Sequence, residues 1–278
     1  MKLYSKEFSK SKHKHLTLLG MSGVGKTHLS KLLRLKDKWY HYSGDYRIGT
    51  EYLNDAILAN IKQQIKQDEC LANLLDNDSI TVQNHITFDN LSSVSSFLGK
   101  VGNPELGGLP IGEFNRRQAL HREAEAQTML DVGEFIKKSQ AQGYRHFIND
   151  AGGSLCELDD NKVYQSLADN TLIVYIRAHE DNESALIERA RTHPKPLYYQ
   201  QNFLQQQLET YLQENQFSYV AQIDPDAFVR WVFPRLLKHR KPKYEAIARQ
   251  YGCTIDSTDL HQCQNSSEVM ELITGAIR

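Results

Sequence analysis

Gly20-Met21-Ser22-Gly23-Val24-Gly25-Lys26-Thr27 is the stretch of sequence that decides the fold. It matches in full the pattern G-x-x-x-x-G-K-S/T, whose glycines let successive backbone N–H groups turn toward phosphate groups. The pattern works between a strand and a helix, and the flanking residues supply both. The apolar run His15–Leu19 predicts a buried parallel strand, and Thr27–Lys36 predicts a helix with its leucines on one face.

The chemistry of this loop predicts binding of ATP with Mg²⁺. Lys26 is expected to reach the β- and γ-phosphates, and the Thr27 hydroxyl is expected to bind Mg²⁺. The helix N-terminus adds partial positive charge beside the phosphates. The predicted nucleotide-binding residues are Ser22, Gly23, Val24, Gly25, Lys26, Thr27 and His28.

A second short strand is predicted to begin at Trp39 and to end in Gly44-Asp45-Tyr46-Arg47. Functional groups gather at the carboxyl ends of strands in a doubly wound sheet, beside the phosphate loop. Asp45 there could accept a proton from an attacking hydroxyl or position it. It could instead cap a helix that begins near Gly49. Arg47 is a candidate for contact with the substrate.

Tyr144–Asp150 predicts a third strand, followed at once by Ala151-Gly152-Gly153. Asp150 would stand at the strand end where a carboxylate holds the magnesium shell. The paired glycines permit close approach of the backbone to a ligand, or form an ordinary turn.

Thr171–Ile176 is the clearest strand, continuous and β-branched, and a helix is expected over Glu183–Ala190. The basic segment that follows could neutralise charge on the transferring phosphoryl group, through Arg189, Arg191 or Lys195. These side chains could equally be solvated. A final strand is expected over Cys253–Thr258, and then a helix over Ser266–Ile277 with Ser266 as N-cap.

Composition is that of an ordinary globular protein: 278 residues, 40% hydrophobic and 24% charged, with a formal net charge of −1. This balance predicts no global nucleic-acid or membrane surface, and no apolar run approaches the length of a spanning helix. The four scattered cysteines indicate a reducing compartment, so we expect a cytoplasmic protein. Five lysines near the N-terminus favour a solvated lead-in over a nucleic-acid-binding arm; they are Lys2, Lys6, Lys10, Lys12 and Lys14.

We expect one domain over residues 1–278 with two inserts, at 51–120 and 198–235. The first insert holds an expected helix over Tyr52–Leu75 and then Gly99–Gly112, where seven of fourteen residues are glycine or proline, a composition typical of a loop or lid. A charged helix over Arg116–Glu125 follows, whose arginines could bind an anion or be solvated. The second insert could extend a lid or mediate oligomerisation.

In their order, these pieces resemble the shikimate-kinase-like branch of the phosphate-loop kinases, and more distantly gluconate kinases, adenylylsulfate kinases and zeta-type toxins. Asp45 resembles the family's substrate aspartate, and Ala151-Gly152-Gly153 its glycine-rich substrate turn, with alanine for the first glycine. Lys195-Pro196-Leu197 resembles the lid, where the family carries arginine. His121-Arg122-Glu123-Ala124-Glu125 loosely resembles a Phe-Arg-x-x-Glu motif, with Arg116 and Arg117 competing for the role of Arg122.

The same resemblance makes Arg240-Lys241-Pro242-Lys243-Tyr244, with Ala248 and Thr254–Thr258, similar to the closing helix and strand. It implies that Arg240 contacts an anionic substrate. The substrate-binding residues it implies are Asp45, Arg47, Arg122, Gly152, Gly153, Lys195 and Arg240.

The prediction is therefore an α/β protein: a three-layer α/β/α sandwich with a parallel sheet and an inserted, mostly helical substrate-side subdomain. We expect transfer of the ATP γ-phosphate to a hydroxyl of a small anionic metabolite. The catalytic residues are then Lys26, Asp45, Arg189 and Arg191, with Thr27 and Asp150 on the metal. Two alternatives stay open: a nucleotide-dependent switch or ATPase acting on a protein or nucleic acid, and a polynucleotide or macromolecule kinase.

Overall fold

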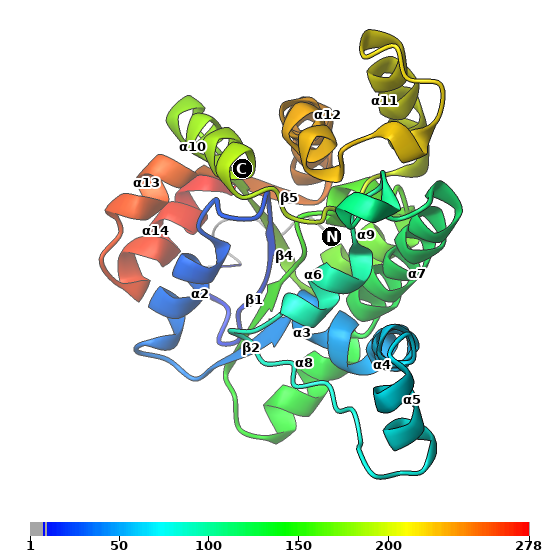
Figure 1. Cartoon of the computed structure of the whole chain (residues 1–278). Coiled ribbons are helices and arrows are strands. Elements are labelled where there is room, and N and C mark those ends of the chain that lie inside the picture. Colours follow the sequence, from blue (N-terminus) through cyan, green and yellow to red (C-terminus); the bar gives the residue numbers. More distant parts are fainter. Residues whose placement is uncertain (1–7, 9, 278) are drawn as a thin grey trace.

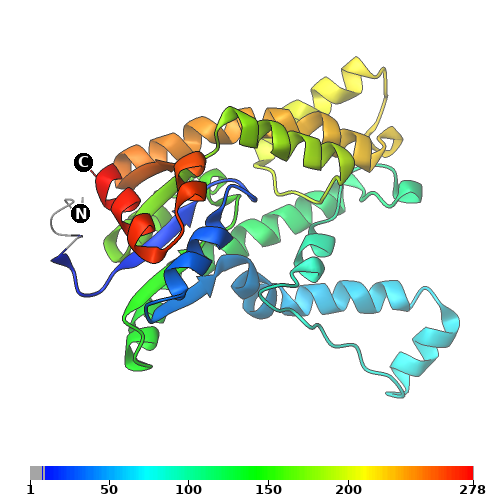
Figure 2. The same cartoon turned by 90° about the vertical axis from the view of Figure 1, so that its left-hand side faces the viewer.

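The structure is a computed structural model that describes residue 8 and residues 10–277. Lys2 and Lys6 of the lysine-rich stretch lie outside the described residues. The described chain contains one parallel five-stranded sheet, in the order β2-β3-β1-β4-β5. Its strands run across the view in Figure 2. They are β1 (His15–Leu19), β2 (Trp39–Ser43), β3 (His146–Asp150), β4 (Leu172–Arg177) and β5 (Gly252–Asp256).

The position of β1 explains where a site should form. This strand is central, and Leu18 aligns with Asp150 of β3 on one side and with Val174 of β4 on the other. The chain passes to β2 and β3 on one side of β1, and to β4 and β5 on the other. In open α/β sheets such a switch point leaves a crevice at the carboxyl ends of the strands. The phosphate-binding pattern begins at Gly20, directly after β1.

Helices cover both faces of the sheet and give the predicted three-layer α/β/α sandwich (Figure 1). One layer holds α2 (Lys26–Arg34), α13 (Ser257–Gln262) and α14 (Ser266–Ala276); the other holds α8 (Val132–Ala141), α9 (Asn161–Asn170) and α12 (Pro225–Tyr251). The main core lies between these layers, and its strand residues Leu16, Leu18 and Leu19 are fully buried. The N-cap of α14 is Asn265, whose side chain accepts from two backbone N–H groups, so the prediction of Ser266 as the cap was wrong.

The remaining helices belong to the inserts and connections. They are α3 (Gly44–Arg47), a π-helical turn (Ile48–Tyr52), α4 (Asn54–Ile65), α5 (Glu69–Asp76), α6 (Ser92–Leu98), α7 (Ile111–Leu130), α10 (Glu180–Thr192), α11 (Gln201–Glu214) and the 3₁₀ turns Pro104–Leu106, Leu155–Glu157 and Val220–Gln222. The first insert has a small core of its own, in which Ile48, Leu53, Ile57 and Phe97 pack near Ala124 of α7. Helix α5 projects from the body of the molecule (Figure 2).

Two predicted helices differ most from the structure. The expected helix over Tyr52–Leu75 is broken, because α4 ends at Ile65 and the Asp68 carboxylate caps a new helix by accepting from the Leu71 N–H at 3.0 Å. Leu71, in this second helix, is 40% exposed. Helix α7 is longer than the Arg116–Glu125 segment, running from Ile111 to Leu130.

A single long helix joins the second insert to the sheet. Helix α12 begins inside this insert at Pro225 and continues without a break to Tyr251, next to β5. Its first half packs with α11 around a second apolar cluster that includes Phe203, Phe228 and Val232.

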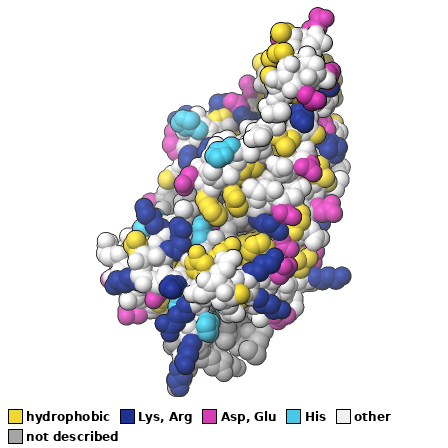
Figure 3. Space-filling model, turned by 90° about the horizontal axis from the view of Figure 1, so that it is seen from below, with side chains coloured by type: hydrophobic (Ala, Val, Ile, Leu, Met, Phe, Trp, Pro, Cys, Tyr) yellow, Lys and Arg dark blue, Asp and Glu magenta, His cyan; other side chains and the backbone are white. Residues whose placement is uncertain are grey.

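Among the described helices, none combines the length and the apolar character needed to cross a bilayer. On the face shown in Figure 3, Lys and Arg side chains gather toward one end, while Asp and Glu side chains are more frequent toward the other. The near-zero net charge therefore averages over an uneven surface.

Two glycines in this fold give a matched prediction about stability. A Cβ on Gly252 would lie 1.9 Å from the carbonyl oxygen of Ile173 on β4, whereas a Cβ on Gly275 of α14 would meet nothing within 4 Å. We expect Gly252→Ala to lower the free energy of unfolding by about 3 kcal/mol, because β5 must shift away from β4. Gly275→Ala should leave it unchanged or raise it by about 0.5–1 kcal/mol. Urea denaturation measures both, and equal effects would contradict the strand register.

Candidate active site

A cavity of about 480 Å³, called here the loop cavity, lies at the carboxyl ends of β1, β2 and β3. It brings together most of the predicted nucleotide and metal residues. Its lining includes Ser22, Gly23, Gly25, Lys26, Thr27, His28, His41, Asp45, Phe88, Asp150 and Gly153. Val24 differs from the others, because its side chain is 1% exposed and packs in the main core.

The backbone of the loop requires glycine at three positions. Gly20, Gly23 and Gly25 have φ angles of 144°, 95° and 112°, in the region that side chains rarely adopt. A Cβ on Gly20 would also lie 2.8 Å from the Ile176 carbonyl oxygen. Helix α2 starts directly afterwards at Lys26, so its unpaired N-terminal N–H groups face the loop. This cradle fits a phosphate group.

Lys26 is buried at the base of the loop cavity. Its ammonium group donates to the carbonyl oxygens of Gly20 at 2.7 Å and Met21 at 3.1 Å. Burial lowers the pKa of Lys26, and the carboxylates of Asp150 and Asp45 oppose that shift. The cation is therefore held over the loop by backbone carbonyls and faced by two acidic side chains.

Asp45 points into the cavity and does not cap a helix. The N-cap of α3 is Ser43, whose hydroxyl accepts from the Tyr46 N–H at 3.3 Å, so the capping alternative for Asp45 was wrong. Burial raises the pKa of Asp45, Lys26 opposes this shift, and Asp150 adds to it. A carboxylate with a raised pKa is better suited to accept a proton near neutral pH.

The donor set suits a magnesium ion. The Thr27 hydroxyl and the Asp150 carboxylate line the same cavity, and oxygen ligands of this kind are those that Mg²⁺ prefers. His41 Nε2 lies 3.7 Å from Asp150 Oδ2, beyond hydrogen-bond distance. Within the described residues, no group of three or more His, Cys, Asp or Glu side chains has the spacing of a protein-only metal site. This fits an ion that also needs phosphate oxygens.

A second cavity of about 350 Å³, called here the apolar cavity, adjoins the first. Ser22, Asp45, Leu91 and Gly153 line both cavities. The remaining walls are mostly apolar and come from α6, α10, α12 and the segment after α10: Val94, Leu98, Leu186, Ala190, Pro196, Leu197, Tyr198, Val229 and Phe233. Asp45 thus stands where the loop cavity meets the apolar cavity.

Glu125 is a buried carboxyl group. In the sequence it stood out only as the last residue of the loose match to Phe-Arg-x-x-Glu. It is fully buried, and Glu125 Oε2 accepts from the Ser154 hydroxyl at 2.6 Å. Glu125 Oε1 has no hydrogen-bond partner among the described residues. A Cβ placed on Gly152 would lie 2.7 Å from this oxygen and 3.1 Å from Asp45 Oδ1. The glycine turn therefore lets two carboxyl groups approach each other.

A helical pattern in the sequence could have identified the buried face of α7. Phe114, Gln118, His121, Glu125 and Thr128 recur at alternating spacings of four and three residues, and all are buried along α7. A stripe that faces a core is usually apolar. Polar residues on it are therefore informative, because a buried polar group needs a hydrogen-bond partner.

Burial raises the pKa of Glu125 to about 8. The hydrogen bond from Ser154 opposes this shift, and the neighbouring Asp45 adds to it. The folded protein then holds a proton that the unfolded chain releases near the ordinary value of 4.5. This contribution to stability is fully present below about pH 4.5, and is lost as the pH rises toward 8.

We expect Glu125→Gln to remove this dependence. Between about pH 5 and pH 8, wild-type protein should lose on the order of a few kcal/mol of unfolding free energy relative to Glu125→Gln. Urea unfolding across this range measures the difference. Glu123→Gln, an exposed position in the same helix, is the matched control. Parallel pH profiles for wild type and Glu125→Gln would show that Glu125 does not carry the proton.

Arg240 lies at the edge of the apolar cavity, but has a carboxylate partner within the protein. Its guanidinium donates to Glu157 through Nε at 2.7 Å and Nη2 at 2.5 Å, and to the Tyr198 carbonyl at 2.8 Å. Glu157 is fully buried, and Arg240 is 3% exposed. The positive charge that the family resemblance assigned to an anionic substrate is therefore already paired.

Arg189 is the basic residue of α10 that reaches the loop. Arg189 Nη2 donates to the Ser22 carbonyl at 2.9 Å, and its guanidinium lies where a Cβ on Gly23 would stand. Lys195 lines the apolar cavity and is exposed to solvent.

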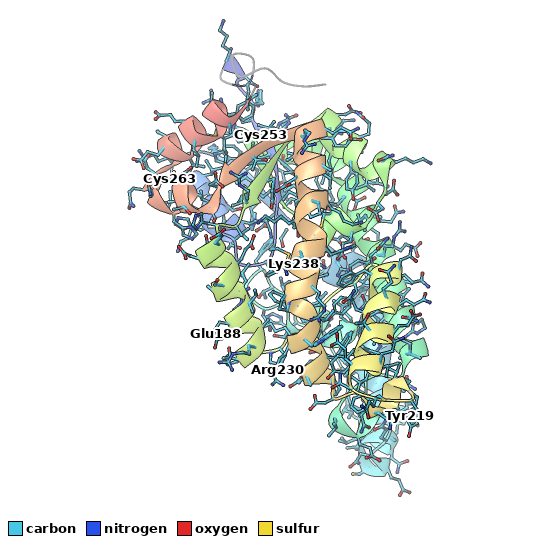
Figure 4. The ribbon with its side chains drawn as sticks, turned by 90° about the horizontal axis from the view of Figure 1, so that it is seen from above. Glu188, Tyr219, Arg230, Lys238, Cys253 and Cys263 are labelled. Atoms are coloured by element: carbon cyan, nitrogen blue, oxygen red, sulfur yellow. The ribbon has the colours of Figure 1, made fainter. Side chains whose placement is uncertain are left out.

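Three of the predicted arginines lie outside both cavities. Arg191 is exposed and paired with Glu188, which lies at the outer side of α10 in Figure 4. Arg47 pairs with Asp131 and Glu51 and stacks on Phe135. Arg122 donates to the Leu158 carbonyl at 2.7 Å and lines a separate hollow behind Tyr198. The position of each arginine on its helix directs its side chain away from the carboxyl ends of the strands.

Arg116 and Arg117, which competed with Arg122, also have partners within the chain. Arg116 pairs with Glu113 on the exposed side of α7. Arg117 is buried and donates to Glu113, to the Phe97 carbonyl and to Asn60. Arg117 therefore joins α7 to α4 and α6 of the first insert, whereas the pair that Arg116 forms lies within α7.

Comparison with known proteins gives one kind of match. No protein-family model matches the chain, and no curated protein matches its sequence. Among solved structures, it is similar to shikimate kinase from Bacteroides thetaiotaomicron, with 15% identity over 93% of this chain and 94% of that one and a TM-score of 0.43. The parallel sheet order, with a G-x-x-x-x-G-K-T loop between β1 and α2, gives this chain a sandwich of the P-loop NTPase type.

Proposed function

We propose that this protein is an ATP-dependent kinase that transfers the γ-phosphate to a hydroxyl group of a small molecule. The observation that carries the proposal is the meeting of two cavities at Asp45. The loop cavity is lined by the glycine-rich loop with Lys26. The apolar cavity has mostly apolar walls with a few polar groups, as small-molecule sites commonly do. A protein that only hydrolysed ATP would not need the second cavity at this position.

In the proposed reaction, the loop N–H groups and Lys26 bind the phosphates, and Asp45 orients the acceptor hydroxyl. The acceptor oxygen forms a bond to the γ-phosphorus as the bond between that phosphorus and the β,γ-bridging oxygen breaks. The electron pair of the broken bond leaves with ADP, and the acceptor's proton passes to Asp45. Bound Mg²⁺, held by Thr27 and Asp150, would neutralise charge on the phosphate oxygens.

A hollow beside the loop suits the nucleobase. It is lined by His179, Asn182, Thr258 and His261 among others. The His261 ring stacks on that of His28, with the ring centroids 5.8 Å apart, and His28 also lines the loop cavity. A base in this hollow would leave its phosphates directed along the loop toward Lys26.

The proposal is tested by measuring ADP release from ATP and Mg²⁺ with and without a panel of hydroxylated compounds. A kinase requires release that depends on the acceptor. Lys26-dependent hydrolysis that is indifferent to every acceptor would favour an ATPase instead. Salt-sensitive RNA or DNA binding would favour a polynucleotide acceptor.

Arg189 and Arg191 provide a matched pair for the same assay. Arg189 contacts the loop at Ser22, so it is placed to stabilise charge that develops during transfer, whereas Arg191 is paired with Glu188 at the surface. We expect Arg189→Ala to lower kcat by about 10²-fold or more, and Arg191→Ala to change it less than about twofold. Equal losses in the two variants would contradict the role given to Arg189.

A further inference from the structure

Four observations on the apolar cavity bear on the chemistry of the acceptor. The first is the composition of its walls. Leu98, Leu186, Leu197, Val229 and Phe233 form much of the lining. Val229 is 2% exposed, yet it belongs to none of the three apolar clusters that pack the interior. Such a side chain contributes an apolar surface to the cavity, where a ligand with an apolar body would gain from contact.

The second observation is the state of Arg240. A carboxylate in this cavity would need a free cation, because burial of an unpaired charge is strongly unfavourable. Arg240 is the cation at the inner wall, and Glu157 already accepts two of its hydrogen bonds. Arg189 and Lys195 belong to α10 and the segment after it, and Arg189 is bound to the phosphate loop at Ser22. Lys195 is exposed to solvent, which screens its charge.

The third observation concerns polar groups left for the ligand. His121 lines the apolar cavity, is 5% exposed, and its Nδ1 has no hydrogen-bond partner among the described residues. Its ring stacks on Tyr198, with centroids 5.4 Å apart, which fixes its plane. Burial lowers the pKa of His121 to about 4, with Arg240 adding to the shift, so the ring is neutral at pH 7. A neutral imidazole can exchange a hydrogen bond with a hydroxyl or amide, but it brings no positive charge to offset that of a carboxylate.

The fourth observation is the acidic end of the cavity. Asp45 lines it, and Glu125 Oε1, also without a partner, lies close to Asp45 Oδ1 beside Gly152. The Asp45 carboxylate repels an anion and can accept a hydrogen bond from a hydroxyl. Burial raises the pKa of Glu125 to about 8, so this group is protonated at pH 7 and can donate or accept a hydrogen bond.

Resting on the proposed kinase function, we propose that the acceptor is an uncharged alcohol with an apolar body and at least two hydroxyl or amide groups, and not an anionic metabolite. One hydroxyl is phosphorylated beside Asp45, and a second polar group binds His121. The apolar remainder packs between α6, α10 and α12. This replaces the anionic acceptor that the family resemblance implied.

Matched pairs of compounds test the proposal on the wild-type protein. Each pair is a hydroxylated carboxylic acid, such as shikimic or quinic acid, and its methyl ester, and the panel includes nucleosides and aromatic diols. Phosphorylation is followed with ATP and Mg²⁺, and binding is followed by calorimetry with ADP and Mg²⁺. We expect the uncharged compounds to be phosphorylated, and kcat/KM for each accepted ester to exceed that of its acid by at least about tenfold.

The other outcomes separate this inference from the kinase proposal. Preference for the acids would overturn the inference and leave the kinase intact. Binding of ADP without binding of any uncharged compound would also overturn it. Failure of the protein to bind nucleotide at all would contradict the proposed function itself.

A variant adds a second line of evidence. Glu157→Gln removes the partner charge of Arg240, so it should raise kcat/KM for acids relative to their esters by at least about tenfold. Glu183→Gln is the control, because it also removes a carboxylate paired with a cation of α12, Lys241, but outside the apolar cavity. Thermal unfolding verifies that each variant is folded. If folded Glu157→Gln keeps the wild-type preference for esters over acids, Glu157 does not exclude acids by pairing with Arg240. If the variant does not fold, the panel of compounds on the wild-type protein decides.

Discussion

Lys26→Ala is expected to lower the rate of ATP turnover by about 10³-fold or more, the largest effect of any single substitution in this chain. The ammonium group lies between the loop carbonyls of Gly20 and Met21 and faces both Asp45 and Asp150. Alanine would remove the cation that the β- and γ-phosphates need, and would leave the acidic side chains to repel them.

Lys31→Ala is the matched control for this prediction. Lys31 lies on the same helix, α2, but is exposed, so its loss should change turnover less than about twofold. Steady-state ADP release measures both variants, and thermal unfolding checks that they fold. Near-normal turnover by folded Lys26→Ala would contradict the assignment of the loop.

Asp45→Asn is expected to lower kcat by about 10²- to 10⁴-fold while changing nucleotide affinity little. Asparagine keeps the size of the side chain and its place between the two cavities, but it cannot take up the proton of the acceptor hydroxyl. Burial raises the pKa of Asp45, so the carboxylate is a stronger base than an exposed one.

Nucleotide titration and acceptor-saturated turnover separate the two parts of this prediction. Asp55→Asn, at an exposed position of α4, should behave as wild type. An Asp45→Asn variant with wild-type kcat would remove Asp45 from the reaction. One that failed to bind nucleotide would instead place Asp45 at the phosphates.

The fold and the loop cavity could be predicted because their signals are local. The strands are short apolar runs, and the loop is a contiguous motif whose geometry follows from its glycines. Asp45 and Asp150 line the same cavity because each lies at or just after the end of a strand, and parallel strands bring their carboxyl ends to one edge.

The apolar cavity could not be predicted in this way, because it is assembled from distant segments. Its walls come from residues near 91–98, 186–198 and 229–240, and no local pattern shows that these meet. Charge by itself was misleading there. Arg240 was read as free for a substrate, but its partner Glu157 lies 83 residues away and becomes its neighbour only in the fold. The arginines at 47, 122 and 191 lie outside both cavities for a related reason, since a helix directs each away from the strand ends.

The central claim is that phosphate passes from ATP to a hydroxyl held beside Asp45, and ³¹P NMR of the complete reaction tests it most directly. Wild-type protein, ATP, Mg²⁺ and an uncharged alcohol from the panel should give ADP together with a new phosphomonoester resonance. Asp45→Asn should give neither within the same time. If inorganic phosphate is the only product that appears with ADP, whichever alcohol is present, the protein is not a kinase for these acceptors and the account is contradicted.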